Sequence, residues 1–91
     1  MDINQLIAIV KKKLESQIVI ENIKIENINV EDKSFLHKNH SGNQLGKYHL
    51  KITISSNELK TMHKIDSNKK IYKVLNKEMK DFIHSIQILI D

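Results

Sequence analysis

Cysteine is absent from this 91-residue chain. The chain therefore forms no disulfide bond and carries no thiolate nucleophile, and any metal ligands that it supplies must be histidine or carboxylate side chains. No run reaches the ~18 apolar residues of a membrane-spanning helix. The first residues, MDINQLIAIVKKK, place lysines after an apolar run, which is the reverse of a secretory signal. We therefore expect one soluble domain over residues 1–91, located in the cytoplasm.

Arginine is absent as well: all fifteen basic residues are lysine, and the formal net charge is +4. A basic surface attracts nucleic acid or acidic proteins through a field that does not depend on sequence. Reading guanine edges, however, relies most often on the bidentate guanidinium group of arginine, and lysine offers only a point charge. The excess of lysine therefore has two interpretations, an attractive surface or the composition of an AT-rich genome.

Motifs of catalysis and of nucleic-acid binding are missing. Gly42 and Gly46 are the only glycines, and their spacing fits a turn rather than a phosphate-binding loop. No GXXG clamp is present, and four aromatic residues give poor support for stacking on bases. Glu31 and Asp32 are neighbours in an expected strand, so their side chains point to opposite faces and do not form an acid–base pair. Without a nucleophile, base and orienting group, we predict that the protein is not an enzyme.

The hydrophobic pattern predicts an α+β fold. Asp2 can cap a helix that runs from Ile3 to near Ser16, and a first strand is expected at about 24–31. The segment YHLKITIS, residues 48–55, alternates cleanly between apolar residues and the polar set His49, Lys51, Thr53 and Ser55, which indicates a half-buried strand paired with the first.

A short helical turn over 57–62, capped by Asn57, precedes an expected long helix over 65–82. The last strand places Ile86, Ile88 and Ile90 on one face, and a right-handed crossover makes it parallel to its partner. The order is α-β-β-α-α-β, with a mixed three-stranded sheet and helices on one face.

Three histidines leave open alternatives. His37 and His40 lie in the loop over 32–46, close to two carboxylates, and the stretch VEDKSFLHKNHSGN is compatible with a metal site, a catalytic pair or a polar loop. His84 interrupts an apolar run where the long helix meets the last strand, and from the residues alone it is a surface histidine near a helix C-terminus. His49 is interpreted as sheet surface.

Four segments in this order resemble the BolA family over nearly the whole chain. They are the acidic-Ser-x-x-His pattern at Asp32, Ser34 and His37, the HFKV-like segment His49-Leu50-Lys51-Ile52, the helix pattern Ile71-Tyr72-Lys73-Val74-Leu75 with Lys77-Glu78-Met79, and the VHAL-like segment within Ile83 to Ile88. The chain departs from the family at Ser67, Asn68 and Lys69, where an Arg-His-Arg stretch is common, and at Thr61, where a glycine is usual.

The resemblance implies a KH-like α+β domain that binds a monothiol glutaredoxin and shares a bridging 2Fe–2S cluster with it, in cluster trafficking or in iron and stress regulation. By resemblance, His84 is one cluster ligand and His37 the second, with His40 in its place if the loop register differs. The glutaredoxin would supply its cysteine and a glutathione thiolate. The isolated protein is expected to be a monomer without a cofactor. The alternative is a small DNA-binding transcriptional regulator of stress or cell-shape genes, which would use Lys69, Lys70, Lys73 and Lys77.

Overall fold

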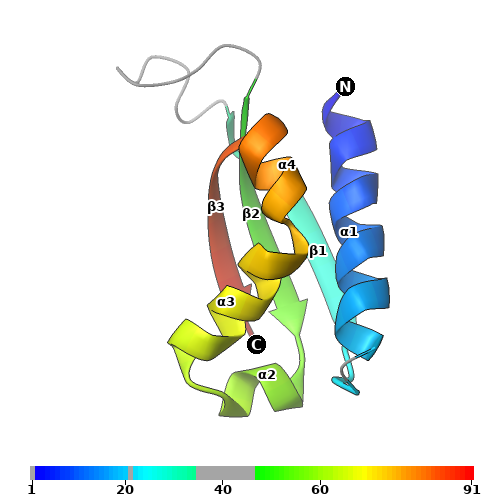
Figure 1. Ribbon diagram of the computed structural model, residues 1–91, viewed down its shortest axis with the longest axis vertical. Coiled ribbons are helices and arrows are strands. Elements are labelled where there is room, and N and C mark those ends of the chain that lie inside the picture. The colour runs from blue at the N-terminus through cyan, green and yellow to red at the C-terminus, as the bar shows by residue number, and fades with distance from the viewer. Residues whose placement is uncertain (1, 21, 35–46) are drawn as a thin grey trace.

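A computed structural model describes residues 2–20, 22–34 and 47–91 of the chain. In this part of the chain the elements follow in the order α1 (Ile3–Ile20), β1 (Asn27–Asp32), β2 (Tyr48–Ser55), α2 (Asn57–Thr61), α3 (Lys64–Val74), α4 (Asn76–Asp81) and β3 (Ile83–Ile90). The strand β2 lies between β1, to which it is antiparallel, and β3, to which it is parallel. Helices α1, α3 and α4 lie on the same side of the sheet (Figure 1). The predicted α+β class, the mixed three-stranded sheet and the one-sided helices are confirmed.

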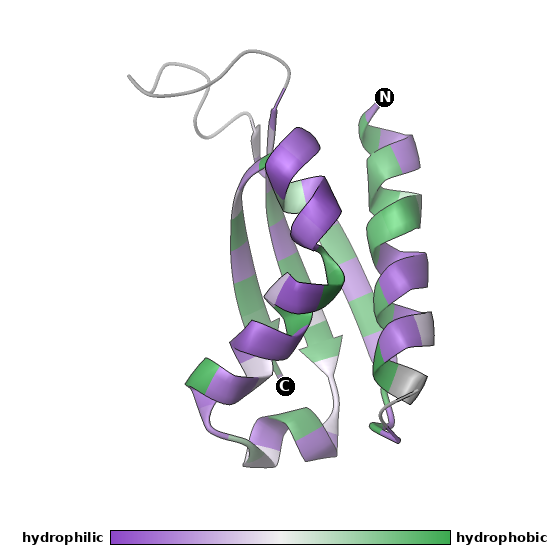
Figure 2. Cartoon of the chain, in the orientation of Figure 1, coloured by the Kyte–Doolittle hydropathy of each residue, from purple (hydrophilic) through white to green (hydrophobic). Residues whose placement is uncertain are grey.

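The alternation along the strands produces one apolar and one polar face, and Figure 2 shows the bands of hydrophobic and hydrophilic residues on the strands. Leu50, Ile52 and Ile54 of β2 are buried, and the register sets Ile28 and Val30 of β1 beside them on the same face. The helices cover this face with a further set of buried residues, which includes Leu6, Val10, Leu14, Ile18, Leu59, Ile71 and Leu75. The opposite face carries mostly polar side chains. We call it the open face.

Two predicted boundaries near the N-terminus are wrong. Helix α1 does not end near Ser16 but continues to Ile20, because Ile18 is fully buried and extends the apolar face by one more turn. Asn22 then adopts a φ of 60°, a left-handed conformation that asparagine tolerates well, and the chain turns back. The first strand begins at Asn27 rather than near residue 24, with Glu26 N–H already donating to the Ser55 carbonyl at 2.8 Å.

The helical crossover also differs from the prediction. Ser56, not Asn57, caps α2: its Oγ accepts the Leu59 N–H at 3.2 Å and donates to the Lys24 carbonyl at 2.7 Å. The expected long helix is divided at Leu75, whose backbone (φ −98°, ψ 14°) leaves the helical region. The bend lets α3 pack on α1 while α4 reaches β3 (Figure 1). Among the described residues, no helix has both the length and the apolar character needed to cross a membrane.

A partly buried ion pair links α1 to α4. Lys13 Nζ lies 2.7 Å from Glu78 Oε2, and the side chain of Glu78 is only 6% exposed whereas that of Lys13 is 38% exposed. The other carboxylate oxygen of Glu78, Oε1, is buried and has no hydrogen-bond partner within the described residues. The ammonium group of Lys13 therefore provides the main compensation for burying this carboxylate.

Replacing Lys13 by methionine is expected to lower the free energy of unfolding by about 1–2 kcal/mol, less than for a fully buried pair because solvent screens the exposed part of Lys13. The double variant Lys13→Met/Glu78→Leu should recover most of this loss, since it leaves no buried charge. Urea denaturation of both single variants and the double variant measures the coupling, with Lys12→Met on the exposed side of α1 as the control. Strictly additive losses would contradict the pairing.

Candidate functional site

His84 occupies an irregular position at the start of β3. Tyr48 pairs with Ile83, but the next residue of β2, His49, pairs with Ser85. His84 is therefore an extra residue on β3, a bulge that has no partner on β2. Helix α4 ends just before it, and the Phe82 carbonyl already accepts the Tyr48 N–H at 3.0 Å, so pairing is established on both sides of the bulge. The imidazole of His84 is exposed while the backbone around it is held in place.

His49 lies directly beside His84. The centroids of the two imidazole rings are 4.9 Å apart and the rings are tilted by 55°. His49 Nδ1 lies 2.7 Å from Ser85 Oγ, and the whole residue is only 6% exposed. The interpretation of His49 as sheet surface is therefore wrong in one respect: it projects from the polar side of β2, as the alternation predicted, but its neighbours bury it. Because His49 lies on the open face, its contact with His84 places the His84 ring at this face too.

The residues that follow β1 are hydrogen-bonded to the backbone of His49. The Ser34 N–H donates to Asp32 Oδ1 at 2.9 Å, and Ser34 Oγ accepts the N–H of His49 at 3.1 Å. The Lys33 N–H donates to the His49 carbonyl at 2.7 Å. The acidic residue and the serine of the pattern Asp32-x-Ser34 thus hold the end of β1 against His49.

The open face is hollowed beside these histidines. A depression of about 500 Å³ is lined by residues of β2 and β3 and by the end of β1, among them Lys33, His49, Lys51, Ser85 and Gln87. Lys33 lies 3.7 Å from Glu31, and both of their side chains are partly exposed, so this ion pair contributes little to stability. The surface next to His84 is accordingly polar and carries two lysines, which suits contact with a charged partner.

The other predicted ligands, His37 and His40, lie outside the described residues. Within the described ranges, no group of three or more histidine, aspartate or glutamate side chains is arranged to hold a metal ion. His84 is therefore the one predicted ligand that the structure places. The sequence did not indicate its contact with His49, because the bulge that brings the rings together depends on the pairing of two strands far apart in the chain.

The lysines of the DNA-binding alternative lie on two helices. Lys69 and Lys73 are exposed on α3, Lys70 is half-buried there, and Lys77 is exposed on α4. In a straight helix, Lys69, Lys73 and Lys77 would form one stripe, but the bend at Leu75 interrupts it. The structure therefore does not place these lysines on the single continuous helix that the sequence predicted.

Together, the split-helix crossover between parallel strands, the antiparallel hairpin and the histidine-bearing bulge define an α+β domain of the kind found in several solved structures. The BolA domain of SufE1 from Arabidopsis thaliana superposes with a TM-score of 0.70 at 24% identity, covering 93% of this chain and 88% of that one. BolA1 from Arabidopsis thaliana gives a TM-score of 0.67 at 17% identity, covering 92% and 87%. BolA1 from Mus musculus gives 0.67 at 17% identity, covering 91% of this chain and 61% of that one. These similarities concern the fold.

The sequence itself matches a family model. Residues 19–90 match the model described as BolA-like protein, from the end of α1 to the last residue of β3. A comparison with curated protein sequences finds no match. The chain belongs to the BolA-like family, as its motifs predicted.

Proposed function

We propose that this BolA-like protein binds a monothiol glutaredoxin and contributes histidine ligands to a 2Fe–2S cluster held between the two proteins. The observation that supports the proposal is the position of His84, which is exposed on a bulge beside His49, whose backbone N–H is hydrogen-bonded to Ser34 Oγ. His84 therefore lies near Ser34, the last described residue before the segment that carries the predicted second ligand, and this proximity supports the proposal.

The number of residues between Ser34 and His37 limits how far His37 can lie from Ser34. His37 follows Ser34 by three residues, and three residues span at most about 11 Å even when fully extended. Ser34 Oγ accepts the backbone N–H of His49, whose ring contacts His84. The chain length therefore allows His37 a distance of at most about 11 Å from Ser34, whereas His40, three residues further along, is allowed about twice that distance. This favours His37 as the second ligand.

The donor chemistry fits such a cluster. Neutral imidazole nitrogen is an established ligand of iron in 2Fe–2S centres, where two histidines on one iron raise the reduction potential relative to cysteine. The chain has no cysteine, so its share of the ligands is histidine or carboxylate, and the proposal assigns histidine. In this proposal the cluster is the group that is transferred, and it is not a resident cofactor of the protein. The residues of this chain provide an exposed imidazole, a fixed backbone around it and a polar surface for the partner.

A titration tests the proposal. The protein is added to a cluster-loaded monothiol glutaredoxin with glutathione, and visible absorption and circular dichroism are recorded. We expect a new spectrum that is complete at one-to-one stoichiometry, because histidine would replace thiolate on one iron. The variants His37→Ala and His40→Ala, measured in the same way, identify the loop ligand by which of them loses the change. An unchanged spectrum, with the glutaredoxin homodimer left intact, would overturn the proposal.

A further inference from the structure

The outer edge of β3 carries backbone groups without strand partners. The strand pairs with β2 on one side, and within the described residues no strand pairs with it on the other. The Asp91 N–H donates to the Ile54 carbonyl at 2.8 Å, and the Asp91 carbonyl accepts the Ser56 N–H at 3.3 Å. Asp91 thus directs both of its groups toward β2. Backbone direction alternates along a strand, so the N–H and carbonyl groups of Ile86, Ile88 and Ile90 point away from β2.

A contact of Tyr72 agrees with this direction. Its hydroxyl donates to the Ile86 carbonyl at 3.4 Å from α3, a helix that packs outside the sheet. This long hydrogen bond satisfies one outward group at the upstream end of the edge. Within the described residues, the outward groups of Ile88 and Ile90 have no such partner, which leaves the downstream half of the edge available for pairing.

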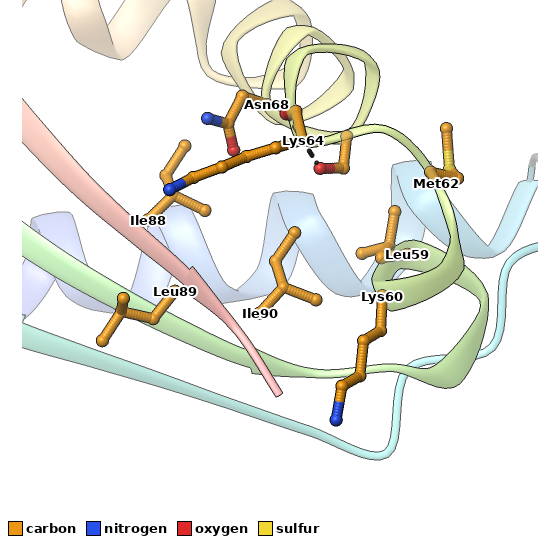
Figure 3. A pocket seen from close by; sticks show the side chains of 9 residues that line it. Leu59, Lys60, Met62, Lys64, Asn68, Ile88, Leu89 and Ile90 are labelled. Atoms are coloured by element: carbon orange, nitrogen blue, oxygen red, sulfur yellow. Dashed lines mark hydrogen bonds between the residues drawn. The ribbon is translucent and has the colours of Figure 1, made fainter.

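The downstream half of this edge borders a cavity of about 280 Å³ between α2, the first turn of α3 and the end of β3 (Figure 3). Its apolar lining comes from Leu59, Met62, Ile88, Leu89 and Ile90. Leu89 is 40% exposed, and Ile65, the residue after Lys64, is 69% exposed. An apolar cavity next to an unpaired strand edge is the arrangement by which extended peptides are captured, through backbone pairing and one anchored side chain.

The polar groups of the cavity indicate the charge of the occupant. Lys60 and Lys64 line it, and neither forms an ion pair with a carboxylate of the described residues (Figure 3). Asn68 Oδ1 is buried and accepts no hydrogen bond within the described chain, so it can receive an N–H from an incoming backbone. Both lysines are exposed and cationic, so carboxylates are the complementary groups on a partner. A second copy of the chain would bring another net charge of +4 to these lysines, so self-pairing at this edge is disfavoured.

We propose that the β3 edge and this cavity bind an extended acidic segment of a partner protein as a fourth strand. The backbone of the segment pairs with the outward groups of Ile88 and Ile90, one apolar side chain enters the cavity, and carboxylates meet Lys60 and Lys64. His84 lies six residues upstream of Ile90, about 20 Å along the strand. This site is therefore separate from the histidine site and stands independently of the proposed cluster.

Amide hydrogen exchange tests the pairing. The probe is the peptide acetyl-DVDIEVD-amide, with acetyl-KVKIKVK-amide as the charge-reversed control, each added up to 1 mM to the ¹⁵N-labelled protein. We expect the acidic peptide to slow exchange at the Ile88 and Ile90 amides at least fivefold. The Gln87 and Leu89 amides, which face β2, should be unchanged.

Paired charge reversals test the lysines. Lys60→Glu/Lys64→Glu should weaken binding of the acidic peptide at least tenfold, whereas the matched variant Lys11→Glu/Lys12→Glu on the exposed side of α1 should not. Several results would overturn the proposal: no response to the acidic peptide at 1 mM, equal binding of the lysine peptide, or protection of the edge by self-association in sedimentation velocity. Binding of oligo-dT at this edge without binding of the acidic peptide would assign the surface to nucleic acid instead.

Discussion

The variant His84→Ala is expected to lose the new spectrum in the glutaredoxin titration completely while keeping its fold. The imidazole is exposed and lies on a bulge, so its removal leaves no cavity in the core, and the free energy of unfolding should change by no more than about 0.5 kcal/mol. If His84 is one of the two proposed ligands, its loss should weaken the proposed complex by at least ~100-fold, the upper range seen even for residues that only support a metal ligand. The measurements are the titration and urea denaturation.

A second histidine provides the matched control. His63 is exposed at the N-terminus of α3 and makes no side-chain capping bond, so His63→Ala removes an imidazole elsewhere on the surface. It should leave the spectrum unchanged. If both variants keep the spectrum, His84 is not a ligand. If His84→Ala also binds DNA with the same salt-dependent affinity as the wild-type protein, the result favours the nucleic-acid alternative over the cluster proposal.

The largest loss of stability is expected from Ile52→Ala. Ile52 is fully buried in the central strand, between Val30 on β1 and Ile88 on β3. Removing most of its side chain should cost about 3–4 kcal/mol, the sum of lost burial and a cavity that the packed helices cannot fill. For a domain of this size the melting temperature should fall by roughly 15–25 °C. Chemical denaturation and a thermal scan measure both quantities.

Ile65→Ala is the control for this substitution, because the same side chain is 69% exposed at the start of α3. Its loss should change the free energy of unfolding by less than about 0.5 kcal/mol. Equal effects of the two variants would show that Ile52 is not in the core. The comparison separates burial from residue type, since the chemical change is identical.

The sheet was predictable because its strands obey local rules. The alternation from Tyr48 to Ser55 was read directly, and the apolar spacing of Ile86, Ile88 and Ile90 together with the helical crossover predicted a parallel partner. The ends of elements were less predictable. The extension of α1 to Ile20 depends on the burial of Ile18 by segments distant in sequence. The long helix divides at Leu75, where the sequence has no glycine or proline that would predict a break.

The site was predictable only in part. His84 was indicated by its position between helix and strand and by the family resemblance, and the structure places it on the surface. Its pairing with His49 was missed, because a bulge is a property of two strands in register and neither strand shows it alone. The hydrogen bond from the His49 N–H to Ser34 Oγ was missed for the same reason, because the two residues are fifteen positions apart in the chain.

The bulge at His84 has a consequence for how such a site can change. A residue within a regular ladder has a directly paired neighbour on the next strand, whereas the extra residue of a bulge has none, and the ring of His84 lies beside that of His49. The pairs Tyr48–Ile83 and His49–Ser85 form without any contribution from the backbone pairing of His84. A cysteine or an aspartate could replace the imidazole there without a compensating substitution in the core. The chemistry of this position and the stability of the domain can therefore evolve independently.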